Sequence, residues 1–408
     1  MLTYIDGGVC AAKGFRSAGI HVGVKTHNVN KKDLALIVSD VECAAAAVFT
    51  TNVVKAAPIH VTKAHLADGK ARAVIANSGN ANACAPQGEE NAEKMCAAAA
   101  KAIGCKPEDV LVCSTGVIGQ TIKIDVIEEG VPKLFPLLEA SAAGSDGAAH
   151  AIMTTDTVKK EAAVETTVGG KTVHIGGIAK GSGMIHPNMG TMLCFLTTDC
   201  AISSAMIHEA LLETAKVSFN RISVDGDTST NDTCLVLANG LAGNPEITGK
   251  NEDYAAFVEA LKALCVSLAR MMAKDGEGAK HLITCTVEGA RDEAQAETIS
   301  KSVISSTLTK AAIFGCDANW GRVLCAMGYS GEQFDPEKVD VSFASAAGSI
   351  AVCEKGRGLP FDEDLAKKIL TESEVTIAIT MGEGNGSCTC WGCDITYDYI
   401  KINGDYRT

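Results

Sequence analysis

The sequence predicts a protein of the α/β class, and two observations lead to that prediction. Short apolar segments typical of strands alternate along the chain with longer alanine-rich segments typical of helices, a pattern that favours sheets covered by helices. The chain has 408 residues, 47% of them hydrophobic, which is enough for a large layered domain or two lobes. Only 4% of the residues are aromatic, so the core must be built mainly from Ala, Val, Ile, Leu and Met.

The first half of the chain contains four segments that are expected to be strands, because each is an apolar run bounded by polar residues or glycine. They are residues 34–40, 45–50, 71–79 and 109–116. Residues 90–104 are rich in Ala, Glu and Lys and end on a glycine, which predicts a helix with a glycine stop. Residues 171–185 are expected to form a strand that runs into a glycine-rich loop.

The second half begins with the apolar run 191–198, expected to be a buried strand. Further elements are expected as helices at 203–218, 253–274 and 292–309 and a strand at 281–290. In the second of these helices one apolar stripe is formed by Tyr254, Phe257, Leu261, Leu264, Leu268 and Met271. The tail, 375–403, is expected to form two strands joined by a Gly/Asn turn. Residues 237–253 are the most loop-like insertion and a candidate lobe edge.

Charge and composition argue against several classes of function. The formal net charge is −13 and the isoelectric point about 5.2, so neither nucleic acid nor an anionic membrane is expected as a partner. The sequence contains neither GxGxxG behind its first strand nor GxxxxGK[ST], so no motif supports nucleotide binding. It also lacks a secretory signal and any apolar run of 18 residues, which predicts a cytoplasmic protein with no membrane span.

Seventeen cysteines are expected to be reduced thiols that pack as small apolar side chains. The densest group is Cys388, Cys390 and Cys393. A zinc site would need a fourth ligand and a paired CxxC elsewhere, and the sequence offers no such pair. We therefore expect no metal. A cysteine-rich metal-binding protein is the alternative from a different functional class.

Three loops of small residues are candidates for catalysis. In 114–120, Thr115 and Gly116 offer a hydroxyl and an unobstructed backbone N–H, which suit an oxyanion hole. Lys180 is a lone cation in a Gly/Ser-rich loop, and Glu277 lies between glycines that would let another segment approach closely. Each has a simpler interpretation: a turn from strand to helix, a solvated lysine and an exposed acid at a helix end.

A glycine stands directly before a threonine at the start of the run 191–198. One interpretation is a turn that begins a strand. The other is that the Gly190–Thr191 bond is cleaved by an N-to-O acyl shift, which glycine assists by accepting a strained backbone. Cleavage would give Thr191 a free α-amine with a reference pKa of roughly 7.7–8.0, and this amine could act as the general base for the adjacent hydroxyl.

A series of ordered motifs makes the chain similar to a known family. They include GGVCAAKGF (7–15), ANSGNANAC (76–84), STGVIG (114–119), AKGSGMIHPNMGTML (179–193), FNRISVDGDTSTNDT (219–233), KDGEGA (274–279) and FGCDANWGRVLCAMGYSG (314–331). With these residues the chain resembles, nearly end to end, the ornithine acetyltransferases, also called bifunctional glutamate N-acetyltransferase/amino-acid acetyltransferases of arginine biosynthesis.

The resemblance implies an architecture and a processing event. The fold would be an Ntn-hydrolase-like layered αββα sandwich with an additional smaller α/β lobe in the C-terminal half. The precursor would cleave itself between Gly190 and Thr191 into an α chain, 1–190, and a β chain, 191–408. Scaling 42.2 kDa by length gives chains of roughly 20 and 22 kDa. The chains stay together in the family, and a heterotetramer of two α and two β chains is expected. The family usually has alanine before the cut, so Gly190 departs from its pattern.

The resemblance also implies roles for individual residues. Thr191 matches the nucleophile, and Thr115 and Gly116 match the oxyanion hole. The positions that match substrate-holding residues are Thr154, Lys180, Thr191, Glu277, Asn403 and Thr408, with Thr155 open as an alternative to Thr154. A lysine suits a substrate carboxylate and a glutamate suits a substrate or N-terminal ammonium, whereas Asn403 alone would be interpreted as a turn residue.

The implied reaction is a ping-pong transfer. The acetyl group would move from N2-acetylornithine to Thr191 and then to glutamate, which gives ornithine and N-acetylglutamate. No cofactor is implied, and acetyl-CoA is open as a further acetyl donor. The alternative on a similar fold is an N-terminal-nucleophile aminopeptidase or amidase, which would hydrolyse its substrate rather than transfer a group.

Overall fold

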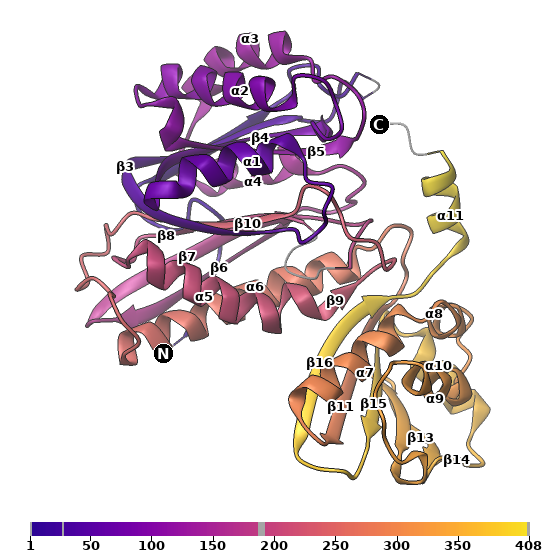
Figure 1. Cartoon of the computed structure of the whole chain (residues 1–408). Coiled ribbons are helices and arrows are strands. Elements are labelled where there is room, and N and C mark those ends of the chain that lie inside the picture. The colour runs from indigo at the N-terminus through magenta and orange to yellow at the C-terminus, as the bar shows by residue number, and fades with distance from the viewer. Residues whose placement is uncertain (1, 27, 187–191, 406–408) are drawn as a thin grey trace.

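The computed structural model describes residues 2–26, 28–186 and 192–405. Figure 1 shows a large body formed by roughly the first two thirds of the chain and a smaller lobe formed by the last third. Both are mixed α/β, which confirms the predicted class. Gly190, Thr191 and Thr408 lie outside the described residues.

The large body is built on one extended sheet. Its strands are β1 (Thr3–Ile5), β2 (Phe15–Ile20), β3 (Leu34–Phe49), β4 (Lys70–Asn80), β5 (Val110–Val117), β6 (Lys160–Val168), β7 (Lys171–Lys180), β8 (Leu193–Thr198) and β10 (Thr233–Ala238). Over the described residues the order is β1-β6-β7-β8-β10-β3-β4-β5, with β2 paired to β3. The helices of this body are α1 (Ala57–His65), α2 (Gly88–Ile103), α3 (Ile124–Leu134), α4 (Ala142–Ile152), α5 (Ser204–Val217) and α6 (Glu252–Lys274).

The sheet and helices form the layers that the resemblance implies. The first half of β3 pairs with β2 and β4 and its second half pairs with β10, so β3 joins the two parts of the sheet. Side chains from both parts share one inner core with α4, including Ile37, Leu111, Ile152 and Phe195. Helices α2 and α3 cover one outer face and α5 and α6 cover the other (Figure 1). The expected αββα sandwich is thus present, with α4 inserted in its inner core.

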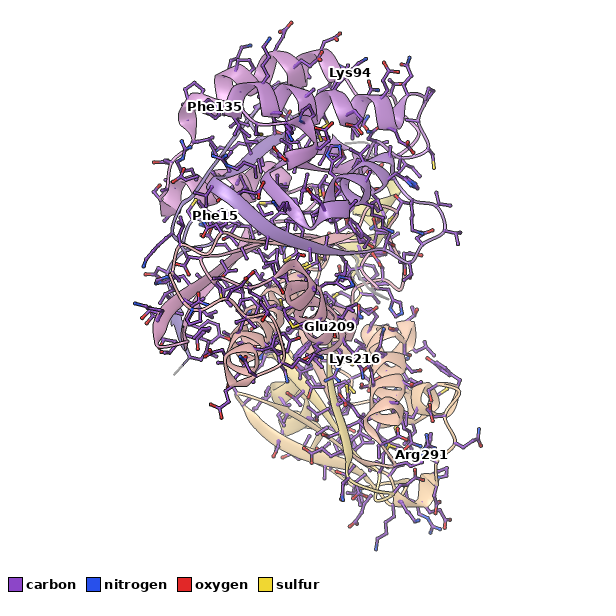
Figure 2. The ribbon with its side chains drawn as sticks, turned by 60° about the vertical axis from the view of Figure 1, so that its left-hand side comes forward. Phe15, Lys94, Phe135, Glu209, Lys216 and Arg291 are labelled. Carbon is purple, nitrogen blue, oxygen red and sulfur yellow. The ribbon has the colours of Figure 1, made fainter. Side chains whose placement is uncertain are left out.

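Labelled side chains mark the same layers in a turned view. Figure 2 shows Lys94 of α2 at the upper outer layer and Glu209 and Lys216 of α5 at the lower outer layer, with Phe15 of β2 between them. Phe15 is fully buried in the inner core. Arg291, in the smaller lobe, lies at the far end of the view.

In the middle of the sheet, neighbouring strands come from distant parts of the chain. Strand β8 lies antiparallel to β7, with Leu193 opposite Lys180, and parallel to β10. Strand β10 in turn pairs with the second half of β3. Two strands that follow residue 191 are therefore enclosed on both sides by strands that precede residue 190.

Strand β5 ends the sheet order at one edge, and α1 covers this edge. The Thr62 hydroxyl of α1 donates to the Val112 carbonyl at 2.7 Å and accepts from the Val112 N–H at 2.9 Å. The side chain thereby takes the place of a neighbouring strand, which satisfies backbone groups that an edge leaves unpaired. This contact fixes the strand that carries Thr115 and Gly116.

The smaller lobe has its own sheet and core. Its strands are β9 (Ile222–Ser223), β11 (Leu282–Ala290), β12 (Asp340–Ser345), β13 (Gly348–Glu354), β14 (Arg357–Gly358), β15 (Glu374–Thr380) and β16 (Gly386–Cys393), in the order β14-β13-β12-β15-β11-β16-β9. Its helices are α7 (Glu293–Ser305), α8 (Thr307–Phe314), α9 (Trp320–Gly328) and α10 (Glu363–Thr371). Helix α11 (Tyr397–Gly404) follows β16 and leads back along the large body (Figure 1).

Several sequence-based boundaries need correction. The strands expected at 34–40 and 45–50 are one strand, β3. The helix expected at 292–309 ends before Ser306, which caps a second helix, α8, by accepting the Thr309 N–H. The two tail strands exist, but β11 lies between them, and the last residues of the tail are helical. Residues 237–253 are not a lobe edge, because they connect β10 to α6 within the large body.

None of the described helices is both long enough and apolar enough to cross a membrane.

Candidate active site

A cleft of about 290 Å³ gathers the described residues that the sequence singled out. Thr115, Gly116, Thr154, Lys180, Glu277 and Asn403 all line it. Thr155 lines it as well, so the choice between Thr154 and Thr155 stays open. The first four come from the part of the chain before residue 190 and the last two from the part after it. The fold therefore joins segments more than a hundred residues apart in one cavity.

Thr115 and Gly116 lie at the end of β5. Gly116 has a φ of +133°, and a Cβ atom there would overlap the backbone of Gly79 and Asn80 on the neighbouring strand, so only glycine fits. The Thr115 hydroxyl accepts a hydrogen bond from Lys180 Nζ at 3.3 Å. Because an ammonium can only donate, this contact leaves the hydroxyl proton of Thr115 free for an acceptor in the cleft. That is the property an oxyanion-hole donor requires.

Asn231 is a cleft residue that the sequence reasoning missed. Its Nδ2 donates to the carbonyl of Ala81 at 2.6 Å and to the carbonyl of Ser114 at 2.9 Å. It thereby ties the end of β4 to the end of β5 directly before Thr115. No local pattern in the sequence announces this role, since both partners are far away along the chain.

The buried side chain of Asp156 binds the backbone of two segments that line the cleft. Its carboxylate accepts the Thr154 N–H at 3.0 Å and the Gly181 N–H at 2.8 Å. Burial alone would raise the pKa of Asp156, but the charges of Lys160 and Lys180 outweigh burial and hold the pKa well below its usual range. Asp156 is therefore an anion at neutral pH, beside the cation that is predicted to bind a carboxylate.

The depressed pKa of Asp156 predicts an acid-dependent loss of stability. A carboxyl whose pKa is lower in the folded state stabilises that state above its unfolded pKa, roughly 3.9, and loses this contribution as the pH falls towards the folded value. In a Thr191→Ala background, which is expected to remain one chain, we expect Asp156→Asn to lower the urea midpoint at pH 7, and the difference in midpoint to narrow below about pH 4. A difference in urea midpoint that stays the same at all pH values would contradict the lowered pKa of Asp156.

Glu277 and Asn403 meet at the other side of the cleft. The Asn403 Nδ2, in the last turn of α11, donates to Glu277 Oε2 at 2.7 Å, so this asparagine is not a simple turn residue. The Glu277 N–H donates to the Ser182 carbonyl at 2.9 Å. Gly183 makes room for the Glu277 carboxylate, because a Cβ atom there would overlap it. The acid is 6% exposed and faces the same cavity as Lys180.

The entry to β8 lies next to this cleft. The described chain resumes at Met192, whose carbonyl accepts the Thr233 N–H at 2.8 Å. The next residue, Leu193, lies opposite Lys180 in the antiparallel pair of β7 and β8. The roles predicted for Gly190, Thr191 and Thr408 concern residues outside the described part of the chain.

The three clustered cysteines do not converge on one point. Cys390 Sγ accepts from Ser300 Oγ at 3.0 Å and lies 3.9 Å from Cys388 Sγ. The thiol of Cys393 instead lies 3.8 Å from Lys310 Nζ. Among residues 2–26, 28–186 and 192–405, no three His, Cys, Asp or Glu side chains are placed to hold a metal ion.

The layered αββα body, and a cleft that brings Thr115, Lys180 and Glu277 together, are the arrangement that the sequence predicts for an acyl-transfer enzyme. A model of the ArgJ family matches residues 16–408. The chain belongs to the ArgJ family and is an acyltransferase of arginine biosynthesis.

Two sequence relatives match the chain over all or nearly all of its length. The arginine biosynthesis bifunctional protein ArgJ of Symbiobacterium thermophilum is 50% identical over 408 residues, which is 100% of both chains. ArgJ 1 of Clostridium acetobutylicum is 50% identical over 395 residues, 97% of this chain and 96% of its own. The solved structure of Mycobacterium tuberculosis ornithine acetyltransferase complexed with ornithine is 40% identical, covers 46% of this chain and 100% of its own, and has a TM-score of 0.43.

Proposed function

We propose that the protein transfers the acetyl group of N2-acetylornithine to glutamate through an acetyl ester on Thr191. The observation that supports this most directly is the single cleft that holds Thr115, Lys180 and Glu277 together. Lys180 suits the α-carboxylate that both substrates share. Glu277 suits the ammonium of ornithine. Thr154, Asn403 and Thr408 complete the proposed substrate contacts.

The proposed chemistry uses the chain's own groups. The α-amine of Thr191 takes the proton of its own hydroxyl, and Oγ attacks the acetyl carbonyl. The Thr115 hydroxyl and the Gly116 N–H stabilise the oxyanion, a contribution of roughly 3–4 kcal/mol for one such donor in other enzymes. The C–N bond to ornithine breaks, and the leaving amine receives the proton. The amine of glutamate then attacks the ester and restores the Thr191 hydroxyl.

The free α-amine that this mechanism needs would come from self-cleavage between Gly190 and Thr191. We propose that chains 1–190 and 191–408 remain associated and assemble as a heterotetramer in the cytoplasm. The strand order supports the association, because β8 and β10 lie between β7 and β3. Gly190 in place of the usual alanine is sterically compatible with the cut and would affect its rate.

Transfer is distinguished from hydrolysis by following the acetyl group. With N2-acetylornithine carrying a labelled acetyl group, we expect labelled N-acetylglutamate to appear in step with ornithine when glutamate is present. The measurement is mass spectrometry of both products over time. Labelled acetate at the same rate with or without glutamate would instead identify an aminopeptidase or amidase of similar fold. The same assay with labelled acetyl-CoA as the only donor tests whether acetyl-CoA is a further acetyl donor.

A further inference from the structure

Lys160, at the start of β6, is a charged side chain with no access to solvent. Its Nζ lies 2.5 Å from Asp156 Oδ1 and 2.5 Å from Asp275 Oδ2. Asp156 and Lys160 precede residue 190, and Asp275 follows α6 in the second half of the chain. Buried ion pairs of this kind contribute little net stability, because removing the charges from water offsets their attraction. We therefore looked for the role of Lys160 in the backbone groups that Asp156 and Asp275 bind.

The carboxylates bind the backbone of two segments that line the substrate cleft. Asp156 accepts the N–H groups of Thr154 and Gly181, the latter directly after Lys180. Asp275 accepts the N–H of Thr157 at 3.1 Å. All of these bonds go to segments that carry proposed substrate contacts.

A second chain of bonds reaches the acidic side of the cleft. The carbonyl of Asp275 accepts the Ser182 hydroxyl at 2.7 Å, and the carbonyl of Ser182 accepts the Glu277 N–H at 2.9 Å. Lys160 is thus the common partner of the Asp156 and Asp275 side chains, and these two residues are linked through the backbone to Lys180 and Glu277.

The charge balance has a consequence for substrate. Lys160 is in contact with both carboxylates, Asp156 and Asp275. Lys25 also interacts with Asp156 through its charge. Asp156 responds to the charges of Lys160 and Lys180, so Lys180 belongs to the same electrostatic group. Without Lys160, both carboxylates would lose the ammonium that contacts them, and their uncompensated charge would weaken the attraction of Lys180 for a substrate carboxylate. Charges in a buried site act with a lower effective dielectric than in water.

We propose that Lys160 is a positioning residue that sets the affinity of the cleft for glutamate, by neutralising Asp156 and Asp275 behind Lys180. The inference rests on the proposed acetyl transfer to glutamate. Glutamate carries two carboxylates and a net negative charge, whereas N2-acetylornithine has one carboxylate and one ammonium. A change in the charge of the cleft must therefore affect the affinity for glutamate more than the affinity for N2-acetylornithine.

Steady-state kinetics of acetyl transfer test this role. For Lys160→Met we expect the KM for glutamate to rise roughly tenfold, the KM for N2-acetylornithine to change less than threefold, and kcat to stay within about threefold of wild type. Asp275→Asn should shift the KM for glutamate the opposite way, since it leaves an excess of positive charge. The double variant Lys160→Met/Asp275→Asn restores the balance and should return this KM towards the wild-type value.

A matched control separates charge from general loss of packing. Lys310 is also a buried lysine, and its Nζ donates to the Cys393 carbonyl in the smaller lobe. Lys310→Met should lower the unfolding midpoint without raising the KM for glutamate.

Equal rises in both KM values, or no change for Lys160→Met, would overturn the proposal. If Lys160→Met does not fold, an unchanged or raised KM for glutamate in Asp275→Asn would do so. Absence of transfer by the wild-type enzyme would instead refute the proposed function, so the two failures are distinct.

Discussion

Thr191→Ala is expected to remain a single chain near 42 kDa and to show no acetyl transfer, whereas wild type separates into chains of roughly 20 and 22 kDa. Alanine has no hydroxyl to attack the carbonyl of Gly190, so the N-to-O shift cannot begin. The same hydroxyl is the proposed acetyl acceptor, so both activities are lost together. Intact mass under denaturing conditions, on untagged protein, measures the first and the labelled-acetyl assay the second.

Thr191→Ser is the matched control for this change, because it keeps a hydroxyl at the same position. It should still be cut, at a rate that time-resolved mass measurement would give. A wild-type chain that stays whole after long incubation would leave Thr191 without a free amine, and the proposed mechanism would then be wrong for this protein.

Gly116→Ala is expected to have the second largest effect. The new Cβ would meet the backbone of Gly79 and Asn80, which cannot move as a flexible side chain can, and the residue would keep a φ of +133°. We expect a loss of about 2–4 kcal/mol in unfolding free energy from overpacking and strain. Displacement of the oxyanion donor should lower kcat by roughly 10²-fold or more. Urea unfolding is best compared on the uncut Thr191→Ala background, where unfolding involves one chain.

Gly119→Ala is a control that introduces backbone strain without a steric overlap of the new Cβ atom. Gly119 also has a positive φ, +78°, but no atom lies within 4 Å of the position that a Cβ atom would take there. This change should cost only about 1 kcal/mol and leave kcat near the wild-type value. Equal effects at both glycines would show that the close approach of β4 to Gly116 is unimportant.

The fold was predictable where a local pattern is strong. The stripe of α6 follows the helical period, and Tyr254, Phe257 and Leu264 are buried as the pattern requires. The break at Ser306 could not be predicted, because a serine can either lie within a helix or cap the start of a new one. Only the tertiary contacts around Ser306 decide between these two structures. The separation of β15 from β16 was equally hidden, since pairing with β11 is a long-range choice.

The site divides in a similar way. Thr115, Lys180 and Glu277 could be predicted as site residues because of the small residues around them and the family resemblance, and all three line the cleft. Asn231 and Lys160 were not found. In the sequence Lys160 is one charge among several in TVKKE, and its burial depends on Asp275, which is distant along the chain. Residues that act by supporting others carry no local signal.

Because β8 and β10 lie between β7 and β3, it matters whether the chain folds before or after it is cut. While the chain is whole, folding is unimolecular and can place these strands inside the sheet. Once the chain is cut, neither piece holds the complete set of neighbours, so renatured pieces must first find each other and then interleave. The mature enzyme would depend on kinetic stability, and its heat inactivation would be irreversible and dependent on concentration, while the uncut precursor could recover its fold on cooling.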